Sequence, residues 1–390
     1  MQEKCTIIGK ILKAVDRRKF KKIVDKYKGD YYAKTLSCWE QFIAILLGQI
    51  TNSNSLRDIE TLIKYHSSQQ YHLGIRNDIA RSTLAKANEK RSWRIYMDLF
   101  NSLVKKLKIQ EQTSSKQFIN LIDSTPIRLD LLKHSWAEET QRIKGLKVHL
   151  MYNLTEETPT YFTITGAKTN DIVEGKKMSI TLGATYVFDK GYTDYNWWKE
   201  IDEAGAYFVT RLKKHANIKE ISEIQVTSEI LSSQLISFAS KKVGHHKINN
   251  SYYGKPLKKV LVSREEEGKE PLILITNDLK RSDEEIAELY KKRWQIELFF
   301  KWIKQNLKIK NFLGRSENAI RTQICIAMIS YVLMKLVEEL KEILFEVKNN
   351  ISDRIFMKLI GNELFRTLNL RMYGRKRWKN PNQLQFMLNF

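Results

Sequence analysis

The segment Phe118-Ile119-Asn120-Leu121-Ile122-Asp123 is an apolar run that predicts a short β-strand ending in an acid. Pro126 follows and is expected to close the run, because proline restricts the residue before it and has no backbone N–H. A similar run, Ala184-Thr185-Tyr186-Val187-Phe188-Asp189, predicts a second strand that also ends in an aspartate. If the two strands are neighbours in one sheet, Asp123 and Asp189 meet at the sheet edge, where active sites form in α/β folds.

These two aspartates also have an ordinary interpretation. An aspartate at the end of a strand is a common turn former, and Asp171, Asp194 and Asp278 lie in similar surroundings. As catalytic groups, paired carboxylates would instead offer the hard oxygen ligands that Mg²⁺ or Mn²⁺ prefers. The two strands by themselves leave both interpretations open.

The rest of the chain around these strands predicts an α/β fold, a mixed sheet flanked by helices. Further strands are expected over residues 147–152, 160–165, 206–211 and 271–276, and a helix over 194–204. Residues 212–270 are rich in Ser, Lys, Tyr and β-branched residues with glycine turn signals, and we interpret them as a β-rich insertion. A long helix is expected to begin at Ser282, which can form a capping box with Glu285, and another covers about 316–345.

The first part of the chain has a helical and basic pattern. Residues 10–28 carry Arg17, Arg18, Lys19, Lys21 and Lys22. Residues 39–47 and 56–63 have helical periodicity on either side of a polar break, and residues 81–88 resemble another turn into a helix. Helix, short turn, helix is the layout of many DNA-reading modules and also of any small helical bundle. The basic charge favours DNA contact.

Composition narrows the class of protein. The chain has 390 residues and a formal net charge of +23, a surplus that favours a polyanionic partner such as DNA. The longest apolar run, residues 324–334, is too short to cross a bilayer, and the N-terminus has no signal-peptide core, so we expect a cytoplasmic protein without a membrane partner. Three scattered cysteines, Cys5, Cys38 and Cys325, argue against a disulfide framework or a structural zinc site.

The predicted helix after residue 282 carries a narrow polar strip. At about 100° per residue, Tyr290, Arg293, Glu297 and Lys304 fall on one side of the helix, with bulky apolar residues on both flanks. A carboxylate next to two cations and a phenol suits a phosphodiester bound beside a metal. An exposed ion pair between Arg293 and Glu297 is an equally simple interpretation of the spacing.

Here the residues carry a family resemblance. Tyr290-x2-Arg293-x3-Glu297-x6-Lys304 resembles the YREK signature of bacterial insertion-sequence transposases of family four, a branch of the DDE transposases. The strand around Asp123 is similar to that family's first-aspartate strand, and Phe188-Asp189-Lys190-Gly191-Tyr192 is similar to its second. The order strand-Asp, strand-Asp, β-insertion, helix-Glu also agrees. The segments 39–62 and 72–85 resemble the leader domain of one subgroup, so the resemblance covers nearly the whole chain.

The resemblance implies a fold and a domain plan. An RNase H-like catalytic core is expected over 116–211 and 271–346, interrupted by the β-rich insertion at 212–270. A helical DNA-binding domain is expected over 1–115, and a basic C-terminal region over 347–390.

The resemblance also implies an activity and its residues. Asp123, Asp189 and Glu297 would bind two Mg²⁺ or Mn²⁺ ions and catalyse cleavage at the terminal inverted repeats and strand transfer into target DNA. Tyr290, Arg293 and Lys304 would hold phosphates of the transposon end. The partners would be the double-stranded ends, the target DNA and a second copy of the chain in a synaptic complex, with the protein on the nucleoid when bound. Whether a DNA hairpin forms stays open.

Other residues give weaker signals. In a relative of this family the insertion supplies an aromatic wedge for a flipped base; Trp197, Trp198, Tyr252 and Tyr253 are loose candidates for it, and none matches a motif well enough to be assigned. His149 is either a histidine near the metal site or a satisfied structural one, and Arg211 is either a DNA contact or a solvated arginine. The basic aromatic run Tyr373 to Lys379 is either a phosphate contact or a solvated tail.

Two other functional classes compete with a transposase. A DNA-binding protein that has lost catalysis would lack one of the carboxylates, and all three are present. A related nuclease would cut without joining, and only the family resemblance favours transposition over it.

Overall fold

The computed structural model describes residues 5–111, 118–130, 132–140, 144–214, 216–224, 230–238, 241–243, 246–248, 255–264, 270–306, 312–338, 340 and 353–368. These residues form two compact units, each defined by its own internal contacts. The first unit contains the described parts of Met1–Gln112, Leu132–Trp136 and Trp302–Phe390. The second contains those of Thr113–Leu131 and Ala137–Lys301.

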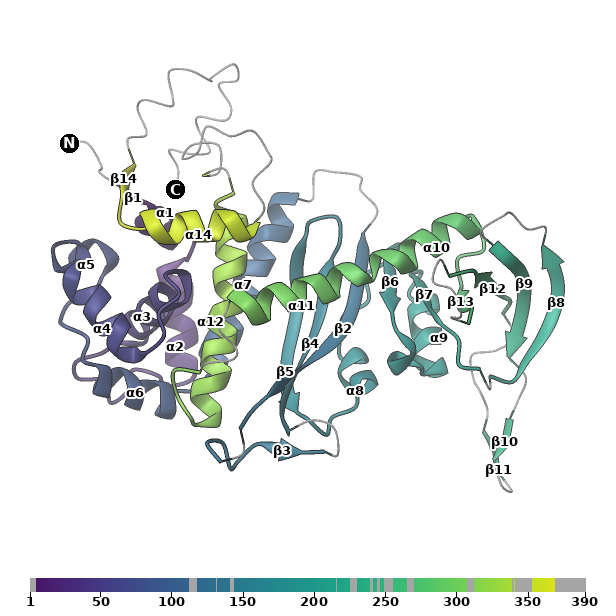
Figure 1. Cartoon of the computed structure of the whole chain (residues 1–390), viewed down its shortest axis with the longest axis horizontal. Helices are drawn as coiled ribbons and strands as arrows, with labels where there is room; N and C mark the ends of the chain where they lie inside the picture. Colours follow the sequence, from purple (N-terminus) through teal and green to yellow (C-terminus); the bar gives the residue numbers. More distant parts are fainter. Residues whose placement is uncertain are drawn as a thin grey trace, which may run out of the picture. The chain divides into compact units, whose positions relative to one another are not determined.

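The second unit is built on one mixed sheet (Figure 1). Within the described residues its strand order is β3-β4-β2-β6-β7-β13-β12-β9-β8, with β5 also paired to β4. Its strands are β2 (Ile119–Arg128), β3 (Glu138–Glu139), β4 (Lys144–Asn153), β5 (Thr158–Gly166), β6 (Thr185–Phe188), β7 (Tyr207–Arg211), β8 (Ile218–Ile224), β9 (Ile230–Phe238), β12 (Leu257–Val262) and β13 (Leu272–Thr276).

The sheet changes direction at its centre. Strands β2, β6 and β7 run parallel, whereas β4 and β5 on one side and β13 on the other are antiparallel to their neighbours. The predicted mixed sheet is therefore confirmed. The strands of the expected insertion continue this sheet through β12, β9 and β8, because β13 pairs with both β7 and β12. A short hairpin, β10 (Lys241–Val243) and β11 (His246–Ile248), pairs only with itself among the described strands.

One expectation for β2 was wrong. The strand does not end at Asp123 but continues through Pro126 to Arg128. Pairing with β6 stops at Ile122, while pairing with β4 continues on the other side. Beyond Ile122 the strand therefore has an edge, and proline is tolerated on an edge strand because a backbone N–H is not required there. Asp123 lies at this one-sided branch point rather than at a strand end.

Four helices and one 3₁₀ turn of the second unit are described next to the sheet. They are α8 (Asp171–Gly175), the 3₁₀ turn η1 (Lys190–Tyr192), α9 (Tyr195–Glu203), α10 (Asp283–Lys292) and α11 (Trp294–Asn306). Side chains of α9, β6 and β7 share a buried core that includes Trp197, Trp198, Phe188 and Phe208. On α11 the apolar residues Ile296, Phe299 and Phe300 are buried, and the Phe299 ring lies 4.8 Å from that of Tyr152 on β4.

The predicted long helix is interrupted at one residue. The expected capping box at Ser282 is present: its hydroxyl accepts the Glu285 N–H, and the Glu285 carboxylate accepts the Ser282 N–H. The helix then tightens at Arg293, whose N–H bonds the Tyr290 carbonyl and whose carbonyl accepts the Ile296 N–H. Such three-residue bonds close a 3₁₀-like turn. Helices α10 and α11 meet at this turn, between the tyrosine and the glutamate of the predicted signature.

The first unit is helical. Its described elements are β1 (Cys5–Thr6), α1 (Ile7–Lys13), α2 (Arg17–Lys26), α3 (Cys38–Ile50), α4 (Leu56–Tyr65), α5 (Ser67–Leu73), α6 (Arg81–Lys90), α7 (Arg94–Glu111), α12 (Glu317–Leu336), α14 (Asp353–Glu363) and β14 (Thr367–Leu368). The helical periodicity predicted over 39–47, 56–63 and 81–88 corresponds to α3, α4 and α6. Helix α3 is buried along its whole length, so it is a core helix rather than a surface for DNA.

Helix α12 packs among the N-terminal helices. It contacts α3, α6 and α7, and its residues from Ile320 to Met334 are nearly all buried. By length and hydropathy it could cross a membrane, but 83% of its apolar window is buried inside the protein. The expected boundaries placed this helix in the catalytic core, whereas its apolar surface on all sides matches a position surrounded by other helices.

Candidate active site

Asp123 points toward α11 from the middle of β2. Successive side chains of a strand alternate between faces, so Asp123 and Ser124 lie on opposite sides of the sheet. One Asp123 oxygen, Oδ1, accepts the Ser124 N–H at 2.7 Å, and the other, Oδ2, accepts a hydrogen bond from Arg293 Nη1 at 3.0 Å. The carboxylate is mostly buried, with 17% of its side chain exposed.

Asp189 directly follows β6. The parallel register pairs Ile122 with Phe188, so Asp123 and Asp189 are the next residues on neighbouring strands. The Asp189 Oδ1 accepts the Gly191 N–H at 2.7 Å and caps the turn η1. A β-carbon on residue 191 would lie 2.8 Å from this oxygen, which explains why glycine occupies the turn.

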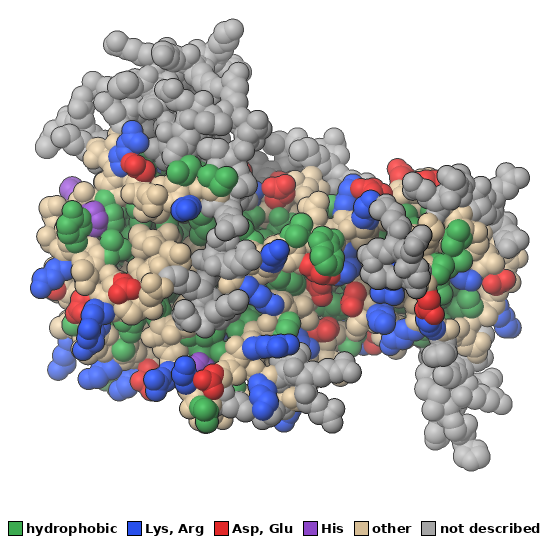
Figure 2. All heavy atoms as spheres, viewed as in Figure 1, with side chains coloured by type: hydrophobic (Ala, Val, Ile, Leu, Met, Phe, Trp, Pro, Cys, Tyr) green, Lys and Arg blue, Asp and Glu red, His purple; other side chains and the backbone are tan. Residues whose placement is uncertain are grey.

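Glu297 lies on α11 one turn after Arg293. The Arg293 guanidinium donates to Asp123 through Nη1 and to the Glu297 Oε1 through Nη2, the latter at 2.7 Å. The predicted pair between Arg293 and Glu297 therefore exists, but the arginine side chain is only 16% exposed and bridges two acids. Tyr290 is buried one turn earlier, with its ring centroid 5.7 Å from the Arg293 Cζ. Figure 2 shows acidic side chains gathered where α11 crosses β2 and β6.

The charges of this group interact. Burial is the main reason that the pKa of Asp123 is raised to about 7, and the negative charges of Asp189 and Glu297 raise it further. The Ser124 hydrogen bond and the Arg293 charge act in the opposite direction without cancelling the rise. We call Asp123, Asp189, Glu297 and Arg293 the Asp123 cluster. Its one arginine bonds two of its three acids, so the cluster holds an excess of negative charge.

The donor set suits a divalent cation, although the side chains are not gathered around one point. Among the described residues no three His, Cys, Asp or Glu side chains are close enough together to hold one ion. The guanidinium of Arg293 lies between two of the three acids instead. The chemistry nevertheless fits Mg²⁺ or Mn²⁺, because the ligands are carboxylate oxygens, and a bound cation would oppose the burial and the neighbouring acids that raise the Asp123 pKa.

The remaining predicted binding residues lie near or beyond this cluster. Lys304 is half-buried on α11, two turns after Glu297, in the part of the helix that belongs to the first unit. Arg211 ends β7, and its charge acts on the Tyr290 phenol, whose pKa is raised mainly by burial. Trp294, which the sequence places on an apolar flank of the helix, directly follows Arg293 and is 58% exposed beside the half-exposed Leu298.

Two of the four loose aromatic candidates are buried. Trp197 and Trp198 are almost completely buried, at 1% and 0% exposure, because they fill the core between α9 and the sheet. Neither can serve as a wedge for a flipped base. Tyr252 and Tyr253 lie outside the described residues, as does the basic run Tyr373 to Lys379.

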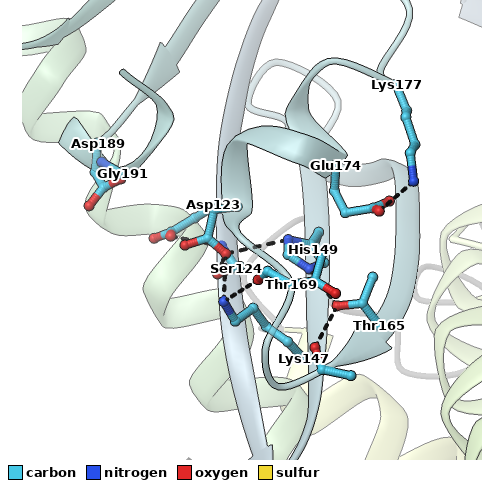
Figure 3. Close-up of polar contacts among 12 residues, drawn as sticks. Asp123, Ser124, Lys147, His149, Thr165, Thr169, Glu174, Lys177, Asp189 and Gly191 are labelled. Carbon is cyan, nitrogen blue, oxygen red and sulfur yellow. Dashed lines mark hydrogen bonds and ion pairs between the residues drawn. The ribbon is translucent and has the colours of Figure 1, made fainter. Parts of the chain in front are cut away.

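The surroundings of His149 agree with the interpretation of a structural histidine. It is fully buried, and its Nε2 lies 2.8 Å from the Thr165 hydroxyl. Burial lowers its pKa to about 4, so the ring is neutral at physiological pH. Two of the comparable acids are also structural, since Asp194 caps α9 and Asp278 pairs with Arg281. The third, Asp171, lies with His149, Ser124 and Lys147 on the other side of β2 (Figure 3).

The sequence matches two family descriptions. Residues 114–333, more than half of the chain, match the family described as Transposase DDE domain. Residues 3–76 match a domain of unknown function, DUF4372.

Several known proteins are similar to the chain. The transposase y4zB of Sinorhizobium fredii is 39% identical over 67% of this chain and 72% of its own length. Transposases for the insertion sequence elements IS4SA of Synechocystis and IS5377 of Geobacillus stearothermophilus are 26% and 25% identical, over 77% and 65% of this chain and 82% and 66% of their own lengths.

A solved structure, the piggyBac transposase synaptic complex with hairpin DNA, gives a TM-score of 0.44 at 14% identity, covering 98% of this chain and 82% of that one. That TM-score is too low to establish a relationship by itself. The match to the DDE domain family confirms the RNase H-like fold that was expected from the sequence. The insertion-sequence relatives confirm that the chain belongs to the bacterial branch of this family. The chain belongs to the DDE transposases, in the branch that bacterial insertion sequences encode.

Proposed function

We propose that this transposase cleaves DNA at the inverted-repeat ends of an insertion sequence and transfers the strand ends into target DNA. Asp123, Asp189 and Glu297 are the catalytic residues in this proposal. The observation that carries it is the Asp123 cluster, in which two adjacent strands and α11 contribute three acids with too little positive charge to balance them.

The three carboxylates would hold two Mg²⁺ or Mn²⁺ ions. Bound there, the ions would supply activation of a water or 3′-hydroxyl and stabilisation of the leaving oxygen. The carboxylates have to turn toward one another for this, because no three of the described ligating side chains meet at one point. A cation bound between them would lower the Asp123 pKa, because its positive charge opposes the effects of burial and of the neighbouring acids that raise it.

Arg293 has a second role in this proposal. Its planar guanidinium, which now bridges Asp123 and Glu297, matches the geometry of a phosphate equally well. We expect it to exchange a carboxylate for a DNA phosphate once the acids are otherwise balanced. Tyr290 and Lys304 are proposed to hold neighbouring phosphates, and exposed Trp294 offers a surface on which a base can stack.

The helical unit is proposed to bind the transposon ends. Exposed basic residues occur on α2, among them Arg18, Lys19 and Lys22, and on α6, among them Arg81 and Lys86. Figure 2 shows such side chains along the edge formed by α4 and α6. Pairing of two ends by two copies of the chain, and a location on the bacterial nucleoid in the cytoplasm, remain predictions of the same proposal.

A strand-transfer assay tests the proposal. The full chain is incubated with a labelled end of its own element, Mg²⁺ and a target plasmid. Cleaved ends joined to the plasmid are the expected product, and Glu297→Gln should form none while still binding the end. Nicks without joined product would favour a nuclease, and binding without any cleavage would favour a DNA-binding protein without catalysis.

A further inference from the structure

A second polar cluster surrounds Asp171 at the start of α8. The Ser124 hydroxyl donates to the Asp171 Oδ1 at 2.7 Å. The Lys147 ammonium donates to the same oxygen at 3.1 Å and to the Thr169 carbonyl at 2.9 Å. We call Asp171, Ser124, Lys147 and His149 the Asp171 cluster, of which Figure 3 labels Ser124, Lys147 and His149. It lies directly behind Asp123, because Ser124 is the next residue on β2.

The sheet register places these groups on one face. Ser124 is opposite His149, and Pro126 is opposite Lys147, so the side chains of Ser124, His149 and Lys147 project together and away from Asp123. The His149 Nδ1 lies 3.5 Å from the Asp171 Oδ1, but the ring is neutral and turns its other nitrogen to Thr165. Lys147, only 12% exposed, is therefore the cation that balances Asp171.

The same helix also contacts the turn that carries Asp189. A β-carbon on Gly191 would lie 3.7 Å from the Asp171 Oδ2, so this oxygen faces the turn. A β-carbon on Gly175 would lie 3.0 Å from the Tyr192 ring, which shows how closely α8 and η1 approach. Asp171 thus bonds the residue after one catalytic aspartate and lies against the turn of the other.

We propose that Asp171 is a positioning residue that fixes the distance between Asp123 and Asp189 through its hydrogen bond to Ser124 and its contact with the Asp189 turn. The inference rests on the proposed function. Side chains that orient metal ligands from behind affect metal affinity about 10- to 100-fold. A purely structural ion pair between Asp171 and Lys147 would instead leave metal affinity unchanged.

Mn²⁺ binding to the full-length protein without DNA measures this role. Free Mn²⁺ is followed by electron paramagnetic resonance for the wild type and for Asp171→Ala, Asp171→Asn and Ser124→Ala. We expect Asp171→Ala and Ser124→Ala each to weaken binding about tenfold. Asp171→Asn keeps an acceptor for Ser124 and should recover most of the affinity. The double variant Ser124→Ala with Asp171→Ala should bind Mn²⁺ no more weakly than either single variant, because the two substitutions remove the same hydrogen bond.

Two control variants separate the outcomes. Asp202→Asn removes another paired aspartate of the same unit, which bonds Lys255 and Asn277, and should leave Mn²⁺ binding unchanged. Asp123→Asn should lose binding. Three outcomes would overturn this inference and leave the proposed function standing. They are wild-type affinity in Asp171→Ala, additive losses in the double variant, and no recovery in Asp171→Asn. If Asp171→Ala does not fold, Ser124→Ala decides, because it removes the same bond without leaving Lys147 unbalanced. Wild-type binding that survives in Asp123→Asn would overturn the proposed function and the inference with it.

Discussion

The polar clusters on the two faces of β2 differ in the balance of their charges. In the Asp123 cluster the guanidinium of Arg293 bonds two of the three acids, Asp123 and Glu297, and the Asp123 pKa is raised to about 7. In the Asp171 cluster Lys147 bonds Asp171, and in the same helix Glu174 pairs with Lys177 at 2.6 Å. One face is short of positive charge and the other is balanced.

This difference in charge balance distinguishes the proposed metal site from the cluster proposed to position it. A balanced pair stabilises the fold and needs no further partner, whereas buried acids in excess destabilise it unless a cation binds or a proton is taken up. The proposed function places catalysis on the face with the perturbed acids. The balanced face can hold its neighbour in place without binding the metal itself.

The largest effect is expected from removing an acid of the Asp123 cluster. Glu297→Gln keeps the size of the side chain but removes one of three metal-ligating charges, and DNA cleavage should fall at least about a thousandfold. End binding, measured by gel shift, should stay within about threefold of wild type. Glu288→Gln is the matched control, an exposed glutamate on α10 paired with Lys292. Normal cleavage by Glu297→Gln would remove Glu297 from the site.

The pH dependence of DNA cleavage tests whether Asp123 binds the metal. Because the Asp123 pKa is raised to about 7, protons compete with the metal for this carboxylate below that pH. At low Mg²⁺ the cleavage rate should fall up to about tenfold per pH unit between pH 7 and 5.5, and higher Mg²⁺ should move the fall to lower pH. Rates measured from pH 5.5 to 8.5 at two Mg²⁺ concentrations provide the test. A profile that Mg²⁺ does not move would contradict a metal role for Asp123.

Stability should change in opposite directions on the two faces. The folded pKa of Asp123 lies above its unfolded value, so its contribution to stability is present at low pH and is lost as pH rises toward 7. In metal-free protein at pH 8, Asp123→Asn should therefore raise the free energy of unfolding by about 1 kcal/mol, or roughly 2–4 °C in Tm. At pH 5 the gain should shrink.

Asp171→Asn should instead lower the free energy of unfolding by about 1–3 kcal/mol, because it leaves the buried Lys147 without its carboxylate. Thermal unfolding followed by circular dichroism in EDTA measures both variants. Changes of the same sign in Asp123→Asn and Asp171→Asn at pH 8 would show that the two faces do not differ as described.

The smallest expected effect concerns the phosphate contacts. Arg293→Ala and Lys304→Ala should each reduce the slope of log K against log salt for end binding by about one, which is roughly a threefold to fourfold change between 50 and 200 mM salt. Lys301→Ala, an exposed lysine on α11, serves as a neighbouring control. An unchanged slope in Arg293→Ala would mean that the guanidinium stays with Asp123 and Glu297 when DNA binds.

Much of this molecule is encoded in local sequence pattern. The alternating and apolar runs predicted β4, β5, β6, β7 and β13, and helical periodicity predicted α3, α4 and α9. The signature spacing and the two aspartate runs selected Arg293, Glu297 and Asp123, which hydrogen bonds join in the structure, while the roles of these residues stay predictions. These signals are short-range, since a strand's alternation, a helix's turn and a cap each involve only a few neighbouring residues.

Only the tertiary structure decided the features that depend on distant partners. The continuation of β2 through Pro126 results from pairing with β4 on one side alone, and the burial of Trp197 and Trp198 results from the sheet beneath α9. Asp171 looked like an ordinary turn former until the register of β2 and β4 placed Ser124 and Lys147 beside it. A sequence specifies each side chain, but charge balance is a property of what folding brings within a few ångströms of it.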